Sequence, residues 1–166
     1  MAAKKHWSYE LIDMTFYTSN TDILEVEYEV KRISRGRYGF SGFLDFKTDL
    51  DDSVLVDVSL KRSQRREGPY RDTSMKAPNV TLSTAMNVYY KLMIMDTVAE
   101  CCENAPVFKK RFETPLTKRR VIINECEMSQ DGMPLIMPDG FYLLRTSFFG
   151  DNFHAYLDTL ILITNE

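Results

Sequence analysis

The segment Leu24–Lys31 constrains the fold of this chain most, because apolar and charged side chains alternate strictly along it. Successive side chains of a β-strand point to opposite faces, so this pattern predicts a strand with one apolar and one charged face. One face is then expected in a core and the other in water, as in an antiparallel sheet. The residues of the apolar face are Leu24, Val26, Tyr28 and Val30.

Similar alternation recurs along the chain and predicts a mainly β fold. We expect an antiparallel sandwich or cup of about seven strands with one helix. Residues 61–82 are expected to form a basic loop, because Lys and Arg cluster there around Gly68-Pro69. The apolar residues of two further predicted strands are Tyr38, Phe40, Leu44 and Phe46, then Val54, Val56, Val58 and Leu60.

Gly42 interrupts the apolar row of its predicted strand. A glycine at such a position indicates a bulge or space next to the backbone. We expect the missing side chain to leave space in the interior. On that interpretation Gly42→Leu would fill the space, spare stability and prevent uptake of an apolar ligand.

The predicted helix covers residues 83–102, which contain neither Gly nor Pro, and Ser83 is a candidate N-cap. An ordinary surface helix has one apolar face, whereas this segment has two. A second apolar face indicates a buried helix or one that touches a partner or ligand. The two faces comprise Met86, Tyr89, Tyr90, Met93, Ile94 and Thr97, and Val88, Leu92, Met95, Ala99 and Cys102.

The length of 166 residues fits a single domain, with residues 1–7 expected as a frayed terminus. Hydrophobic residues make up 44%, which is enough for a packed core, and the ten Phe and nine Tyr can fill a core or line a cavity. The net charge of −3 argues against a dedicated nucleic-acid binder. No apolar run approaches the length of a membrane-spanning helix, and the first residues do not read as a signal peptide.

Three cysteines and one sequon bear on localisation. Adjacent cysteines rarely bond to each other, so a bridge from Cys101 or Cys102 to Cys126 is expected, with three reduced thiols as the alternative. Asn79 begins an Asn-Val-Thr sequon, a candidate glycosylation site. Both features favour a mature secreted protein.

No catalytic or metal-binding set is evident. His6 and His154 are the only histidines, and His154 borders a turn, where a solvated role is expected. Neither a zinc-ligand pattern nor a phosphate-binding loop is present, so we expect no enzyme, metal or cofactor. Two basic clusters are either solvated loops or a patch for an acidic partner or lipid headgroup. The clusters are Lys61, Arg62, Arg65, Arg66 and Arg71, and Lys109, Lys110, Arg111, Lys118, Arg119 and Arg120.

Several short motifs occur in an order that resembles the arthropod CheB family of chemosensory proteins. This family is similar to the ganglioside activator and the ML-type lipid-recognition superfamily, and the resemblance covers about residues 8–164. The motifs are Arg32-Ile33-Ser34-Arg35-Gly36-Arg37-Tyr38, Cys102 with Pro106, Cys126, Asp131-Gly132-Met133-Pro134, and Pro138-Asp139-Gly140-Phe141-Tyr142.

The resemblance implies one ML-like lipid-binding domain, a β cup around an apolar cavity, secretion, and the binding of lipids or cuticular hydrocarbons. It further implies contact pheromone perception, with a gustatory receptor or channel as a partner. The family disulfide would join Cys102 to Cys126. Cys101 is extra and has no assigned partner.

Strand alternation and the resemblance together select the residues expected to line the cavity. The alternative that these residues pack only against one another stays open, as does a role as a lipid-extracting cofactor of a membrane-lipid hydrolase, which would contact a membrane surface. The predicted ligand-binding residues are Val26, Tyr28, Tyr38, Phe40, Leu44, Val56, Val58, Tyr90, Met93, Leu144, Phe148 and Leu157.

Overall fold

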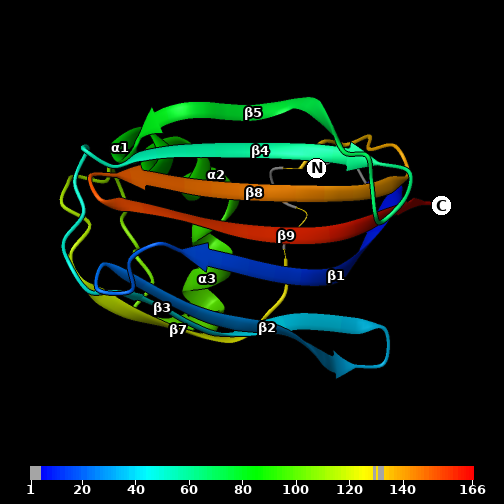
Figure 1. Cartoon of the computed structure of the whole chain (residues 1–166). Coiled ribbons are helices and arrows are strands. Elements are labelled where there is room, and N and C mark those ends of the chain that lie inside the picture. Colours follow the sequence, from blue (N-terminus) through cyan, green and yellow to red (C-terminus); the bar gives the residue numbers. More distant parts are fainter. Residues whose placement is uncertain (1–4, 129, 131–132) are drawn as a thin grey trace.

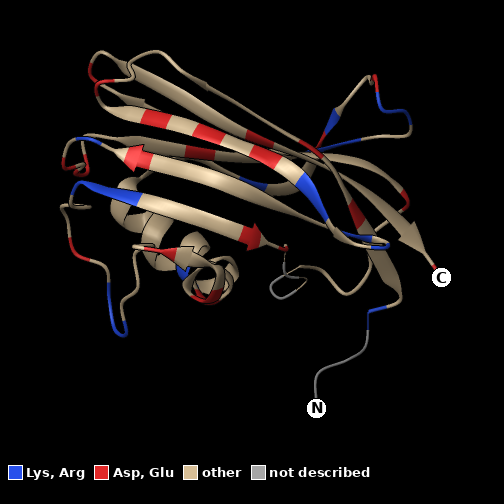
Figure 2. Cartoon of the chain, turned by 90° about the horizontal axis from the view of Figure 1, so that it is seen from below, with Lys and Arg blue, Asp and Glu red and all other residues tan. Residues whose placement is uncertain are grey.

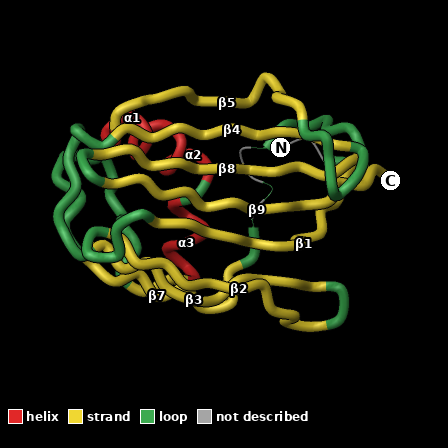
Figure 3. The backbone as a smooth tube through the Cα atoms, in the orientation of Figure 1, coloured by secondary structure: helices red, strands yellow, loops and turns green. Residues whose placement is uncertain are grey.

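The fold is a sandwich of two antiparallel sheets with a short broken helix behind it, seen in a computed structural model that describes residues 5–128, 130 and 133–166 (Figure 1). This confirms the predicted fold class. Part of the Asp131-Gly132-Met133-Pro134 motif lies outside the described residues. Figure 3 shows the loops gathered at the two ends of the strands.

Within the described residues, one sheet has five strands in the order β1-β9-β8-β4-β5 and the other has four in the order β2-β3-β7-β6. All pairs are antiparallel, so each strand can bury one face and expose the other. The strands are β1 (Trp7–Thr18), β2 (Leu24–Ser34), β3 (Arg37–Phe46), β4 (Leu55–Ser63), β5 (Arg71–Thr81), β6 (Cys102–Glu103), β7 (Arg119–Cys126), β8 (Gly140–Gly150) and β9 (Phe153–Asn165).

The alternation along β2 has the predicted outcome. Leu24, Val26 and Tyr28 are buried, and the acidic residues that alternate with them appear as red bands along the ribbon of this strand in Figure 2. In the partner strand β3, Leu44 lies opposite Val26 and Phe46 opposite Leu24. Burial does not alternate along β3 as it does along β2, because residues 40–45 are all partly buried.

The interpretation of residues 61–82 as one basic loop was wrong. The end of this segment forms edge strand β5, which pairs with β4, and only the residues between β4 and β5 form a loop. The strand was hidden because β5 is mostly exposed and contains Pro78, which suits an edge strand but obscures the alternation.

The predicted helix at 83–102 exists but begins earlier and is interrupted. Its N-cap is Thr81, whose side chain accepts from the Thr84 amide, whereas Ser83 instead donates to Asp52. Ile94, with φ −125°, separates the two halves. The pieces are α1 (Leu82–Thr84), η1 (Ala85–Tyr90), α2 (Lys91–Met93) and α3 (Met95–Cys101).

The apolar interior consists of two clusters of buried side chains. The larger joins both sheets to the helix, for example through Val26, Val56 and Met86. The smaller lies toward the chain termini, around Trp7 and Tyr142. Trp7 donates its ring N–H to the Pro134 carbonyl, so even this large side chain has its polar group satisfied.

Gly42 does not adjoin a void. It lies directly opposite Tyr28 in the β2–β3 ladder, and a Cβ atom added to it would lie 2.0 Å from the Glu27 carbonyl oxygen. Its φ of +151° is also rarely adopted by other residues. The alternative of a bulge is confirmed, because the β3–β7 register shifts between Phe40 and Gly42.

Candidate functional site

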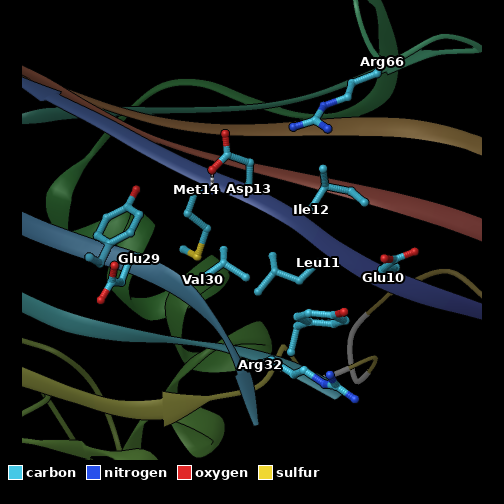
Figure 4. A pocket seen from close by; sticks show the side chains of 11 residues that line it. Glu10, Leu11, Ile12, Asp13, Met14, Glu29, Val30, Arg32 and Arg66 are labelled. Atoms are coloured by element: carbon cyan, nitrogen blue, oxygen red, sulfur yellow. Dashed lines mark hydrogen bonds between the residues drawn. The ribbon is translucent and has the colours of Figure 1, made fainter. Parts of the chain in front are cut away.

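The two sheets meet at a seam between their edge strands β1 and β2, which are neighbours but belong to different sheets. A groove with a volume of about 520 Å³ lies along this seam (Figure 4). It is lined by Glu10, Leu11, Ile12, Asp13, Met14, Tyr28, Glu29, Val30, Arg32, Tyr38 and Arg66.

Apolar side chains form the inner part of the groove. Leu11 is buried, and Met14 and Val30 are partly buried against the smaller core cluster. Met14 also contacts the larger cluster, so the groove borders both. Figure 4 shows the side chains of Leu11, Met14 and Val30 close together between the two strands.

A bulge in β1 makes this arrangement possible. Residues three apart on a regular strand point to opposite faces, so Leu11 and Met14 would not normally lie together. The β1–β9 register shifts between Leu11 and Asp13, which makes Ile12 the additional residue. The shift returns Met14 to the inner side, where both side chains line the groove.

Charged side chains of both signs surround the apolar part. Glu10 and Asp13 come from β1, Glu29 and Arg32 from β2, and Arg66 from the loop between β4 and β5. The groove therefore has a few apolar side chains at its base, and more of its exposed lining is polar than apolar.

Tyr28 holds the seam closed at one end of the groove. Its hydroxyl donates to the Thr15 carbonyl oxygen at 2.7 Å, and its ring lies 5.3 Å from that of Phe16. Burial raises the pKa of the Tyr28 hydroxyl, with the nearby Asp158 carboxylate adding to the effect. The hydroxyl thus stays protonated and continues to donate across the seam.

Most predicted ligand-binding residues lie in or against the core clusters, and the groove gathers only a few of them. Tyr28 and Tyr38 line the groove, and Tyr38 is 36% exposed. Met93 is partly buried on α2 and is not part of either cluster. The remainder are Val26 and Val56, which are buried, and Phe40, Leu44, Val58, Tyr90, Leu144, Phe148 and Leu157, which are partly buried against the clusters.

The disulfide joins Cys101 to Cys126, so the pairing of Cys102 with Cys126 was wrong. Cys101 ends α3, and its sulfur reaches Cys126 at the end of β7. Cys102 is the free cysteine, with its sulfur 3.5 Å from that of Cys126. Burial raises the pKa of the Cys102 thiol, which favours the unreactive protonated form.

Asn79 and His154 lie away from the groove. Asn79 is exposed on β5 with φ +43°, which leaves its side chain open to modification. The His154 ring stacks on Phe149 with centroids 4.7 Å apart. It also lies beside Tyr17 and Tyr156, in an aromatic group on three strands.

Comparison with known proteins does not extend this description. No protein-family model matches the chain, and no curated protein matches its sequence. Among the described residues, the helical segments are too short and too polar to cross a bilayer.

Proposed function

We propose that this protein binds a hydrophobic or amphiphilic ligand, such as a lipid, fatty acid or cuticular hydrocarbon, and carries or presents it. The groove between β1 and β2 supports this proposal, because it joins an apolar floor to a charged rim and borders both core clusters. The alkyl part of the ligand would lie against Leu11, Met14 and Val30. Its polar end would remain at the rim.

The energetics of such binding follow from the apolar floor. Burying an alkyl chain yields about 25 cal/mol per Å² of apolar surface removed from water. Few directional contacts are needed, which agrees with the absence of a sharp sequence motif. Parting the seam at Tyr28 would lengthen the groove toward the larger core cluster, where most other predicted ligand-binding residues lie.

The resemblance described above extends the proposal to contact chemosensation outside the cell, with a sensory receptor or channel as the recipient of the ligand. The disulfide supports an extracellular location, because such bonds persist in oxidising compartments. No enzymatic activity is part of this proposal.

Filling the groove tests the proposal. Val30→Trp adds a large ring beside Leu11 and Met14 and is expected to weaken binding of a fluorescent fatty acid at least about tenfold. Overpacking costs about 1–3 kcal/mol, so the variant should still fold. Fluorescence titration gives the affinity, and thermal unfolding monitors the fold.

Val107→Trp is the matched control, because Val107 is 62% exposed and does not line the groove. It should bind as the parent does. Equal affinity of the parent and a folded Val30→Trp variant would reject the groove as the ligand site.

A protein-interaction module with a filled core is the second candidate. The packing of residues such as Val26, Val56 and Phe148 into the larger core cluster favours it. That candidate predicts that the parent protein binds neither fatty acids nor hydrocarbons in the same titration.

A further inference from the structure

A second concave site lies at the tip of the β4–β5 hairpin and carries excess positive charge. Its volume is about 490 Å³, and Arg66 in the same loop lines the groove between β1 and β2. The site is lined by Arg62, Ser63, Gln64, Arg65, Gly68, Pro69, Arg71, Asp72 and Thr73.

The lining contains three arginines and one carboxylate, Asp72. Arg62 donates from Nε to the Asp139 carbonyl oxygen at 3.0 Å, so the backbone holds it in place. The nearest partner of Arg65 is Glu67 at 3.6 Å, and both side chains are about 70% exposed, which makes this pair weak. In the part of the chain that the structure describes, no ion pair involves Arg62 or Arg71.

Holding like charges around one hollow is unfavourable unless an anion offsets them. A guanidinium group can donate two parallel hydrogen bonds to two oxygens of a phosphate or a carboxylate. The ammonium group of lysine acts as a single point charge and lacks this geometry. Asp72 is the one carboxylate of the lining, Glu67 lies beside Arg65, and the Asp139 carboxylate lies near Arg62. The guanidinium N–H groups that remain free of these partners favour a compact anion over a neutral or cationic group.

We propose that this arginine pocket, lined by Arg62, Arg65 and Arg71, binds a phosphate-type anion. The anion is either free phosphate or the phosphate of a lipid headgroup. The second source rests on the proposed function, since an anionic amphiphile could place its chain in the groove and its headgroup at the hairpin tip.

Two titrations distinguish the sources. Inorganic phosphate is added to the protein while the arginine Nε–H signals are followed by NMR. Separately, binding is measured to vesicles of phosphatidylcholine alone and with added phosphatidic acid. Free-phosphate binding without a preference for the anionic vesicles assigns the site to soluble anions, and binding in both titrations assigns it to the headgroup.

Variants identify the pocket. Arg65→Gln with Arg71→Gln leaves the anchored Arg62 in place and should weaken phosphate binding about tenfold or more. Asp72→Asn removes the one carboxylate of the lining and should strengthen binding.

The control neutralises Lys109, Lys110 and Arg111, which do not line the pocket. The carbonyl oxygens of Lys109 and Lys110 accept from Lys91 of the helix. An equal loss in the control would show an effect of net charge alone and overturn the proposal, as would the absence of phosphate binding by the parent. Fatty-acid uptake by the Arg65/Arg71 variant tests the groove separately from the arginine pocket. If this variant still takes up fatty acid, the groove is intact, whatever the result for phosphate binding.

Discussion

Gly42→Leu is expected to destabilise the domain by about 3 kcal/mol or more, and the folded protein should be scarce. The added Cβ would lie 2.0 Å from the Glu27 oxygen and 2.5 Å from the Tyr28 Cα atom, and both are backbone atoms of the paired strand. A side chain there can be accommodated only by parting β2 from β3. Chemical denaturation followed by far-UV circular dichroism measures the loss.

Gly36 provides the control for this substitution. It too has a positive φ, +75°, but no atom lies within 4 Å of an added Cβ. Gly36→Ala should therefore cost only about 1–2 kcal/mol, the cost of the backbone conformation. A Gly42→Leu protein as stable as the parent would restore the interpretation that Gly42 borders free interior space.

Loss of the disulfide is expected to have the next largest effect. Cys126→Ser and Cys101→Ser should each lower the free energy of unfolding by about 2–5 kcal/mol. Cys102→Ser should be nearly neutral, because Cys102 is the free cysteine. Denaturation of the three variants under non-reducing conditions provides the comparison.

Peptide mapping of the parent adds a direct test of the pairing. Cys101 and Cys126 should appear in one linked peptide pair, and Cys102 should alkylate slowly because burial raises its thiol pKa. A stable Cys101→Ser variant together with a destabilised Cys102→Ser variant would favour the pairing that the family resemblance implies.

The sequence predicted the strands in which burial differs sharply between the two faces. In β2, each acidic residue between apolar ones must face water, so the register follows from the pattern alone. Edge strand β5 was missed because one side of it has no partner strand and its residues are largely exposed. The basic residues that precede it, Lys61, Arg62, Arg65 and Arg66, then suggested a loop.

Other errors concern distances that no periodicity encodes. In the sequence, Gly42 is compatible both with an interior space and with a backbone that passes close by. The position of the β2 backbone next to Gly42 decides between these two interpretations. Likewise, Cys101 and Cys102 are adjacent in sequence, and the end of α3 determines which sulfur reaches Cys126.

The groove was predicted only in part. Tyr28 and Tyr38 were among the expected ligand-binding residues, but Leu11, Met14 and Val30 were not. The seam arises because β1 pairs with β9, which is distant in sequence, whereas β2 belongs to the other sheet. Alternation along a single strand does not reveal which strands pair. The bulge at Ile12 further hides the shared face of Leu11 and Met14.

Photo-crosslinking with palmitic acid that carries a diazirine on its chain tests the central claim most directly. After irradiation of the parent protein, mass spectrometry of the peptides should place the label on the apolar side of the groove, at Leu11, Met14 or Val30, and excess unlabelled palmitic acid should compete. Labelling confined to the exposed helix residues Val88 and Leu92, or no competable labelling, would contradict the assignment of this groove to an apolar ligand.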